Sequence, residues 1–326
     1  MLNQRLLNLA RQAPASLALT ITAAAAGGIT RTAQAFFLSR VVSRVFLHGS
    51  SLTDVAPFLW LLLALSLLRA TLTWTAHLTA RRLAAAVKLH LRQRLVDHLL
   101  RLGPAYIHGQ RTGELVSVVN EGVESLDAYF SQYLPQLALA ALVPLTILAF
   151  VLPLDLLSGL VLLVTAPLIP VFMVLIGSLA DHLTRRQWTA LSRMSAYFLD
   201  LLQGLTTLKL LGRSREQADF IALISDRFRQ VTMSVLRVAF LSALVLELVA
   251  TISTAIVAVE VGLRLLYGRL MFEQAFFILI LAPEFYLPLR LLGTRFHAGM
   301  SGVAAARRIF EVLDTPAPAA PTAAKI

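Results

Sequence analysis

Long apolar stretches alternate along this chain with long basic intervals that keep a helical periodicity. Each apolar stretch reaches the roughly 20 residues that a helix needs to cross the hydrocarbon core of a bilayer. We therefore expect an all-α membrane protein with six transmembrane helices. The six apolar runs lie near residues 15–47, 55–80, 132–152, 156–179, 238–263 and 274–294.

The two intervals 81–131 and 180–237 are too long to be turns. A helical pattern continues from Val55 to Leu100, a length on the order of 70 Å at 1.5 Å per residue. No bilayer is that thick, so part of this helix is expected to stand in water as a stalk. The intervals break once each, at Gly103-Pro104 and at Gly212. Each arm is therefore predicted to be a helix, a short elbow and a second helix, which together make an internal repeat.

Composition and charge placement support a membrane protein with a defined topology. Hydrophobic residues make up 57% of the chain and charged residues 14%, with a net charge of +11. Most Lys and Arg residues outside the apolar runs lie in the two intervals and near the two ends. The three connections expected on the other side of the membrane contain only Arg264 and Arg269. This asymmetry predicts that both termini and both arms are cytoplasmic, and it favours a lipid bilayer over nucleic acid as the partner of the basic charge.

The residue inventory excludes several chemistries. The chain has no cysteine, which excludes disulfides and thiolate metal sites. Its three lysines are Lys88, Lys209 and Lys325, and none of them follows glycine as a P-loop requires. We expect a cytoplasmic tail (1–14), a membrane domain (15–314) and a Pro/Ala-rich linker or tail (315–326). No nucleotide-binding domain, no catalytic residue and no metal site is expected on this chain, and no cofactor apart from a possible haem.

A few ionisable residues fall inside the apolar runs, where charge is costly unless it faces water or a partner. Arg31, Arg69 and Glu284 are expected near mid-depth, and Glu247 in the inner third. One interpretation is a polar cavity in which the arginines attract an anionic substrate. The other is a set of structural ion pairs, Arg69–Glu284 or Arg31–Glu247, and the sequence does not decide between the two.

His77, toward the inner end of the second run, is a candidate haem ligand. The competing interpretation is an ordinary interfacial histidine. We see no pair of histidines at a metal-ligand spacing in the sequence.

Several segments resemble the transmembrane half of type I ATP-binding-cassette (ABC) exporters. Within that family, the stretch Leu281–Arg290 is most similar to the CydD-type subunit of the heterodimeric cysteine/glutathione exporter of cytochrome bd biogenesis. Glu121 departs from the family pattern, which usually has Asp there. The segments that carry the family resemblance are Thr112–Ser117, Asn120–Val123, Gly204–Arg213 and Ala304–Asp314.

The resemblance implies a bacterial inner-membrane protein that forms half of an alternating-access pathway. It implies a homologous partner half, a small anionic or zwitterionic thiol as substrate, haem as a further candidate ligand, and ATP with Mg²⁺ on an associated ATPase domain. The alternatives are a non-transporting scaffold or receptor and an ion-driven carrier. The elbow contacts to the ATPase domain would be Tyr106, Ile107, His108, Gly109, Gly212, Arg213, Ser214, Arg215 and Glu216.

Overall fold

A computed structural model describes residues 4–10, 13–109, 115 and 117–316. In these ranges every regular element is a helix and no strand occurs, which confirms the all-α class. The helices are α1 (Gln4–Ala10), α2 (Pro14–His48), α3 (Leu52–Gly109), the π-helix η1 (Val118–Gly122), α5 (Val123–Ala128), the π-helix η2 (Tyr129–Tyr133), α6 (Leu134–Leu154), α7 (Leu156–Thr165), α8 (Leu168–Gln203), α9 (Leu205–Leu210), α10 (Ser214–Leu266) and α11 (Phe272–Leu313).

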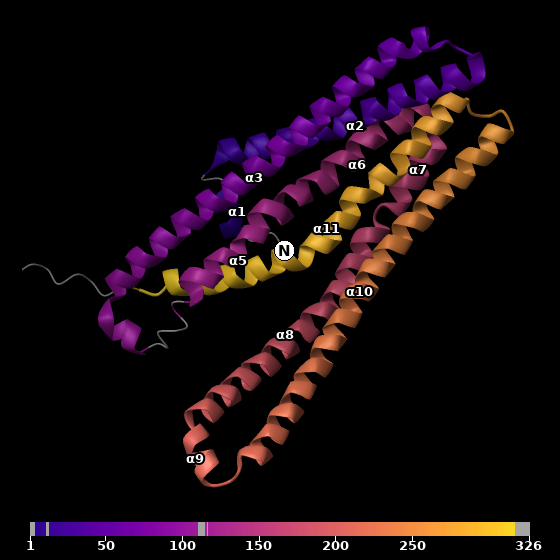
Figure 1. Cartoon of the computed structure of the whole chain (residues 1–326). Coiled ribbons are helices and arrows are strands. Elements are labelled where there is room, and N and C mark those ends of the chain that lie inside the picture. The colour runs from indigo at the N-terminus through magenta and orange to yellow at the C-terminus, as the bar shows by residue number, and fades with distance from the viewer. Residues whose placement is uncertain (1–3, 11–12, 110–114, 116, 317–326) are drawn as a thin grey trace, which may run out of the picture. The chain divides into compact units, whose positions relative to one another are not determined.

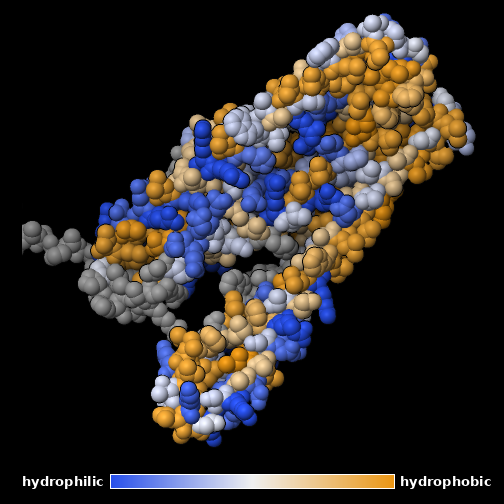
Figure 2. Space-filling model, in the orientation of Figure 1, coloured by the Kyte–Doolittle hydropathy of each residue, from blue (hydrophilic) through white to orange (hydrophobic). Residues whose placement is uncertain are grey.

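The chain divides into two compact units, the first made of Met1–Thr165 and Ser253–Ile326 and the second of Ala166–Ile252. In the first unit, α2, α3, α6 and α11 run alongside one another (Figure 1). Hydrophobic residues predominate at the end of this unit where α2 turns into α3, and hydrophilic residues gather toward its other end (Figure 2). The second unit is a long helical hairpin of α8 and the part of α10 up to Ile252, with α9 at its turn (Figure 1).

Five segments in the described ranges are long and apolar enough to cross a membrane: Leu52–Gly103, Val118–Leu154, Leu156–Gly177, Ser214–Leu266 and Phe272–Phe296. The first predicted run is helix α2, whose 35 residues are long enough to span. Gly27, Gly28, Thr30 and Arg31 lower the hydropathy of its middle. The chain is therefore a multi-pass membrane protein, while the sixth span remains a prediction.

Both arms continue as helices beyond the thickness of a bilayer. The helix from Leu52 to Gly103 has 52 residues, about 78 Å at 1.5 Å per residue, against about 45 Å for a whole bilayer. Gly103 takes φ 75°, a value that glycine adopts without steric cost, and the chain bends there before helix resumes as far as Gly109. The predicted helix, elbow, helix pattern of the first arm is thus confirmed up to Gly109.

The stalk end of the first unit is held by an apolar core. Leu83, Val87, Leu91 and Leu95 recur every four residues on α3, so they form one buried stripe along the helix. This stripe belongs to the same core as residues of α5, η2 and α11, including Ile309. Helix α11 comes very close to its neighbours in this region, because two of its glycines, Gly299 and Gly302, lie directly against tyrosine side chains.

Candidate functional site

A polar site within the apolar part of the first unit joins three helices. Arg31 of α2 donates a hydrogen bond from Nη1 to Oε2 of Glu284 on α11, at 3.0 Å. Arg69 of α3 places Nη2 3.6 Å from Oε1 of the same carboxylate. The three side chains are between 24% and 36% exposed, so they are partly shielded but still reachable. One carboxylate therefore lies between two guanidinium groups.

Two neutral side chains extend this site. Gln34, one turn after Arg31 on α2, accepts a hydrogen bond from Nη1 of Arg69 at 3.2 Å and donates one from Nε2 to Oγ of Ser66 at 2.9 Å. Sequence reasoning missed both residues. The signal for Gln34 was its position three residues after Arg31, which places both side chains on one helix face.

The site carries an excess of positive charge, because two arginines face one glutamate. In a medium of low dielectric an unbalanced cation attracts anions more strongly than it would in water. The expected Arg69–Glu284 ion pair is present at 3.6 Å, and Arg31 pairs with the same carboxylate. Glu247 lies on α10 in the second unit, where its side chain is exposed.

The backbone around Glu284 is less constrained than an ordinary helix. Pro288 lies four residues later and has no N–H to donate to the Glu284 carbonyl, so that helical hydrogen bond is missing. The Pro288 carbonyl accepts a hydrogen bond from Nε2 of Gln136 at 2.8 Å, and Arg295 donates to Oε1 of Gln136 at 2.8 Å. Gln136 is a buried anchor for this proline-containing part of α11, and the sequence had not singled it out for that role.

A second ionic cluster lies at the turn between α6 and α7. Nη1 of Arg264 contacts both carboxylate oxygens of Asp155 at 2.7 Å and Oε1 of Glu260 at 2.8 Å. Ser158 donates its backbone N–H to Asp155 at 3.1 Å, so Asp155 caps the first turn of α7. Burial tends to raise the pKa of Asp155, but the hydrogen bonds from Ser158 and Arg264 outweigh it and hold this pKa below its ordinary value.

The second elbow is a well-formed helix end. Gly212 takes φ 69°, and its N–H bonds to the carbonyl of Lys209 while the N–H of Arg213 bonds to that of Leu208. This is the Schellman arrangement, in which a left-handed glycine closes a helix. Ser214 begins α10, and Arg213 pairs with Glu216 at 3.7 Å on the exposed surface.

Near this elbow, Tyr197 of α8 donates a hydrogen bond to Gln217 of α10, and its ring packs on that of Phe220 with the centroids 4.8 Å apart. These contacts tie the two stalk helices of the second unit together. Of the first elbow, the backbone of Tyr106–Gly109 is helical. The motif residues 112–114 lie outside the described residues.

His77 lies on α3 with an exposed side chain. In the described ranges, no group of three or more histidine, aspartate or glutamate side chains is arranged to hold a metal ion. A single exposed imidazole would supply one nitrogen donor and does not build a pocket around a porphyrin. Haem ligation at His77 therefore stays a prediction.

Comparison with known proteins agrees with this architecture of long membrane helices, helical stalks and elbows. Residues 17–287 match the ABC transporter transmembrane region family, and the chain belongs to that family. It is 38% identical over 293 residues to the protein of Haemophilus influenzae named glutathione/L-cysteine transport system ATP-binding/permease protein CydD, covering 87% of this chain and 50% of that protein.

Two further relatives carry the same transport-system name. The CydD protein of Escherichia coli is 38% identical over 298 residues, with 89% of this chain and 50% of the relative covered. The CydC protein of Bacillus subtilis is 36% identical over 283 residues, with 87% and 50% covered. The chain thus spans about half the length of these curated relatives. Membership of the family implies that its membrane region works with an ATPase.

Proposed function

We propose that this chain is the membrane-spanning part of an ATP-driven exporter of small thiol-bearing anions of the glutathione and cysteine type. The relatives named for glutathione and L-cysteine transport support the substrate class. The observation that carries the proposal is the site of Arg31, Arg69 and Glu284, because it has one more cation than anion. It provides a place for one carboxylate within the apolar part of the protein.

The geometry suggests how such a substrate would bind. A substrate carboxylate can take the place of the Glu284 carboxylate beside Arg31, because guanidinium groups bind either anion through the same N–H donors. Glu284 then keeps Arg69 as its partner, and α11 loses one contact to α2. The missing backbone hydrogen bond at Pro288 lets α11 bend near Glu284 at low cost. Binding is thereby coupled to a change in helix packing, which alternating access requires.

The elbows supply the second half of the mechanism. The stalk helices α3, α8 and α10 are long, and each elbow lies at the end of such a lever. We infer that the termini and both elbows are cytoplasmic and that the elbows dock on ATPase domains. Residues Tyr106–Gly109 and Gly212–Glu216 would then be the contacts that transmit ATPase closure to the spans.

The complete pathway needs a second half. We infer a heterodimer with a homologous chain, set in a bacterial inner membrane and serving cytochrome bd assembly, from the relatives named CydD and CydC. Haem remains a further candidate ligand, for which His77 would supply an imidazole nitrogen.

The test of function is ATP-dependent uptake of labelled glutathione into inside-out vesicles that contain this chain, its homologous partner and their ATPase domains. We expect uptake that stops without ATP. ATP-independent uptake, or no uptake by an assembled and folded complex, contradicts the proposal.

Orientation is tested separately, because the chain has no native cysteine. Single cysteines at Ser214 and Ser117 should react with an impermeant thiol reagent only from the cytoplasmic side. A cysteine at Ser50, between α2 and α3, should react only from the opposite side. The reverse pattern would overturn the orientation.

A further inference from the structure

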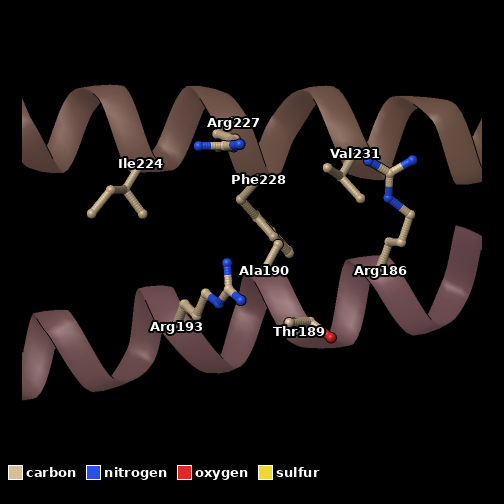
Figure 3. Close-up of a pocket in the computed structure, with 8 residues that line it drawn as sticks. All are labelled: Arg186, Thr189, Ala190, Arg193, Ile224, Arg227, Phe228 and Val231. Carbon is tan, nitrogen blue, oxygen red and sulfur yellow. The ribbon is translucent and has the colours of Figure 1, made fainter.

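The second unit contains a basic groove that the proposed transport site does not use. The groove has a volume of about 500 Å³ and lies between α8 and α10 (Figure 3). Arg186 and Arg193 extend from α8 toward α10, and Phe228 extends from α10 toward α8 between them (Figure 3). Arg227, Ile224 and Val231 also line the α10 side of the groove. The groove is in the size range of small-molecule sites, which is about 300–1,000 Å³.

The positive charge of this groove is not balanced from within. Its described lining contains three arginines and no aspartate or glutamate. The neighbouring carboxylate of Asp226 is occupied, because it pairs with Arg229 at 2.7 Å and accepts a hydrogen bond from Gln230 at 2.7 Å. Among the described residues, none of the three groove arginines forms an ion pair with a carboxylate. Guanidinium groups bind carboxylates and phosphates through paired N–H donors, so the groove favours an anion with more than one acidic group.

The distance of the groove from the membrane-spanning part of α8 argues for a soluble ligand. The fourth apolar run ends near residue 179, and Arg186 lies seven residues further along α8. That separation is about 10 Å along the helix, and Arg193 lies about 10 Å beyond Arg186. The polar headgroup layer on one side of a bilayer is only about 5–8 Å deep. Most of the groove therefore lies in water, past the phosphates of the lipids.

The walls limit the size and shape of the ligand. Phe228 and Ile224 offer apolar contact between the cationic groups, so the ligand should carry its acidic groups at the two ends of a short body. We propose that the α8–α10 groove binds a small soluble dicarboxylate and holds it before it enters the membrane. Its identification with the exported thiol peptide glutathione rests on the proposed function. A cluster of cations raises the local concentration of such an anion at this surface.

The test measures binding by isothermal titration with the purified full-length protein in neutral detergent. The probes are glutarate, a dicarboxylate without a thiol, and glutathione. The Arg31→Gln background weakens the site among the spans, so that the groove dominates the signal. Arg193→Gln and Arg227→Gln should each weaken binding of both probes about tenfold, as expected for loss of a charge-assisted hydrogen bond.

The matched control is Arg229→Gln, two residues from Arg227 on the same helix but paired with Asp226. It should bind both probes as tightly as the unsubstituted protein does. Arg193→Lys keeps the charge and should restore part of the affinity, provided that all variants melt at the same temperature.

The outcomes separate the groove from the proposed function. Equal affinity for glutarate in Arg193→Gln, Arg227→Gln and Arg229→Gln would contradict binding in the groove. So would a loss of co-purifying phospholipid phosphate in the first two variants with no change in glutarate binding, because the groove would then be a lipid site. If glutarate binding depends on Arg193 and Arg227 but vesicles take up no glutathione, the groove stands and the proposed function fails.

Discussion

Arg31 and Glu284 are separated by 253 residues in the chain, yet their side chains meet at 3.0 Å and join α2 to α11. Arg69 holds the other oxygen of the same carboxylate. Because Glu284 is shared by two arginines, a second carboxylate can take its place beside one of them while Glu284 stays paired with the other. In the proposed function, Glu284 is the residue through which binding of an anion alters helix packing.

Removing the charge of Glu284 should separate substrate binding from turnover. Glu284→Gln leaves Arg31 and Arg69 without their anion, so glutathione should bind more tightly and KM should fall. The maximal rate should fall as well, because no carboxylate is left to displace the substrate from the arginines. Initial rates of ATP-driven uptake over a range of glutathione concentrations give both values. An unchanged KM with an unchanged maximal rate would show that Glu284 has no part in binding.

The sequence predicted the helices well because long apolar runs and basic arms leave strong periodic signals. It also singled out Arg31, Arg69 and Glu284, since charge is rare inside apolar runs. It did not predict that Arg31 and Arg69 share one carboxylate, because side-chain pairing depends on how helices rotate against each other. Gln34 and Gln136 were missed because neutral amides are common and only their packing makes them partners.

The interruptions of the arms were predictable for a local reason. Gly103 and Gly212 take positive φ values that most residues avoid. A glycine at each of these positions therefore indicates in the sequence where the helix bends. No residue type in the sequence indicated the two π-helices η1 and η2. The close approach of α11 to η2 was likewise invisible, because Gly299 and Gly302 are two of 16 glycines in the chain.

Gly302→Ala should destabilise the first unit. A Cβ at Gly302 would lie 2.9 Å from Cβ of Tyr129 and 3.1 Å from the carbonyl oxygen of Ser125, so backbone would have to move. We expect a loss of about 1–3 kcal/mol in the free energy of unfolding, measured by denaturant titration in detergent. Gly27→Ala is the control, because nothing lies within 4 Å of its added Cβ. Equal stability of the two variants would mean that α11 packs less closely.

The cluster at Asp155 should make the turn between α6 and α7 sensitive to acid. Its lowered pKa means that the folded state binds the proton more weakly than the unfolded state does. The stabilisation is fully present above the ordinary aspartate pKa of about 3.9. It is lost as the pH falls below that value and through the lowered pKa of the folded state.

Asp155→Asn should remove this acid dependence and lower the melting temperature at neutral pH, where the ion pair with Arg264 is otherwise intact. Melting curves at several pH values between about 2 and 7 compare the two proteins. Parallel pH profiles would contradict the assignment.

Gly212→Ala should uncouple the second elbow from transport. An L side chain at φ 69° costs on the order of 1–2 kcal/mol, so the Schellman turn should distort while α8 and α10 remain. We expect glutathione-stimulated ATP hydrolysis of the assembled complex to fall while unstimulated hydrolysis persists. Gly262→Ala, in open space on α10, should leave both rates unchanged. Full stimulation in Gly212→Ala would argue against a coupling role for this elbow.

The most direct test of substrate binding at Arg31 is ATP-driven glutathione uptake by Arg31→Gln, compared with Arg40→Gln. Arg40 lies on the same helix, nine residues after Arg31, and its guanidinium lies over the Phe58 ring, 5.8 Å from the ring centroid. We predict that KM for glutathione rises at least about tenfold in Arg31→Gln and is unchanged in Arg40→Gln. The same KM in both variants, with both proteins folded, would contradict a substrate carboxylate binding at Arg31.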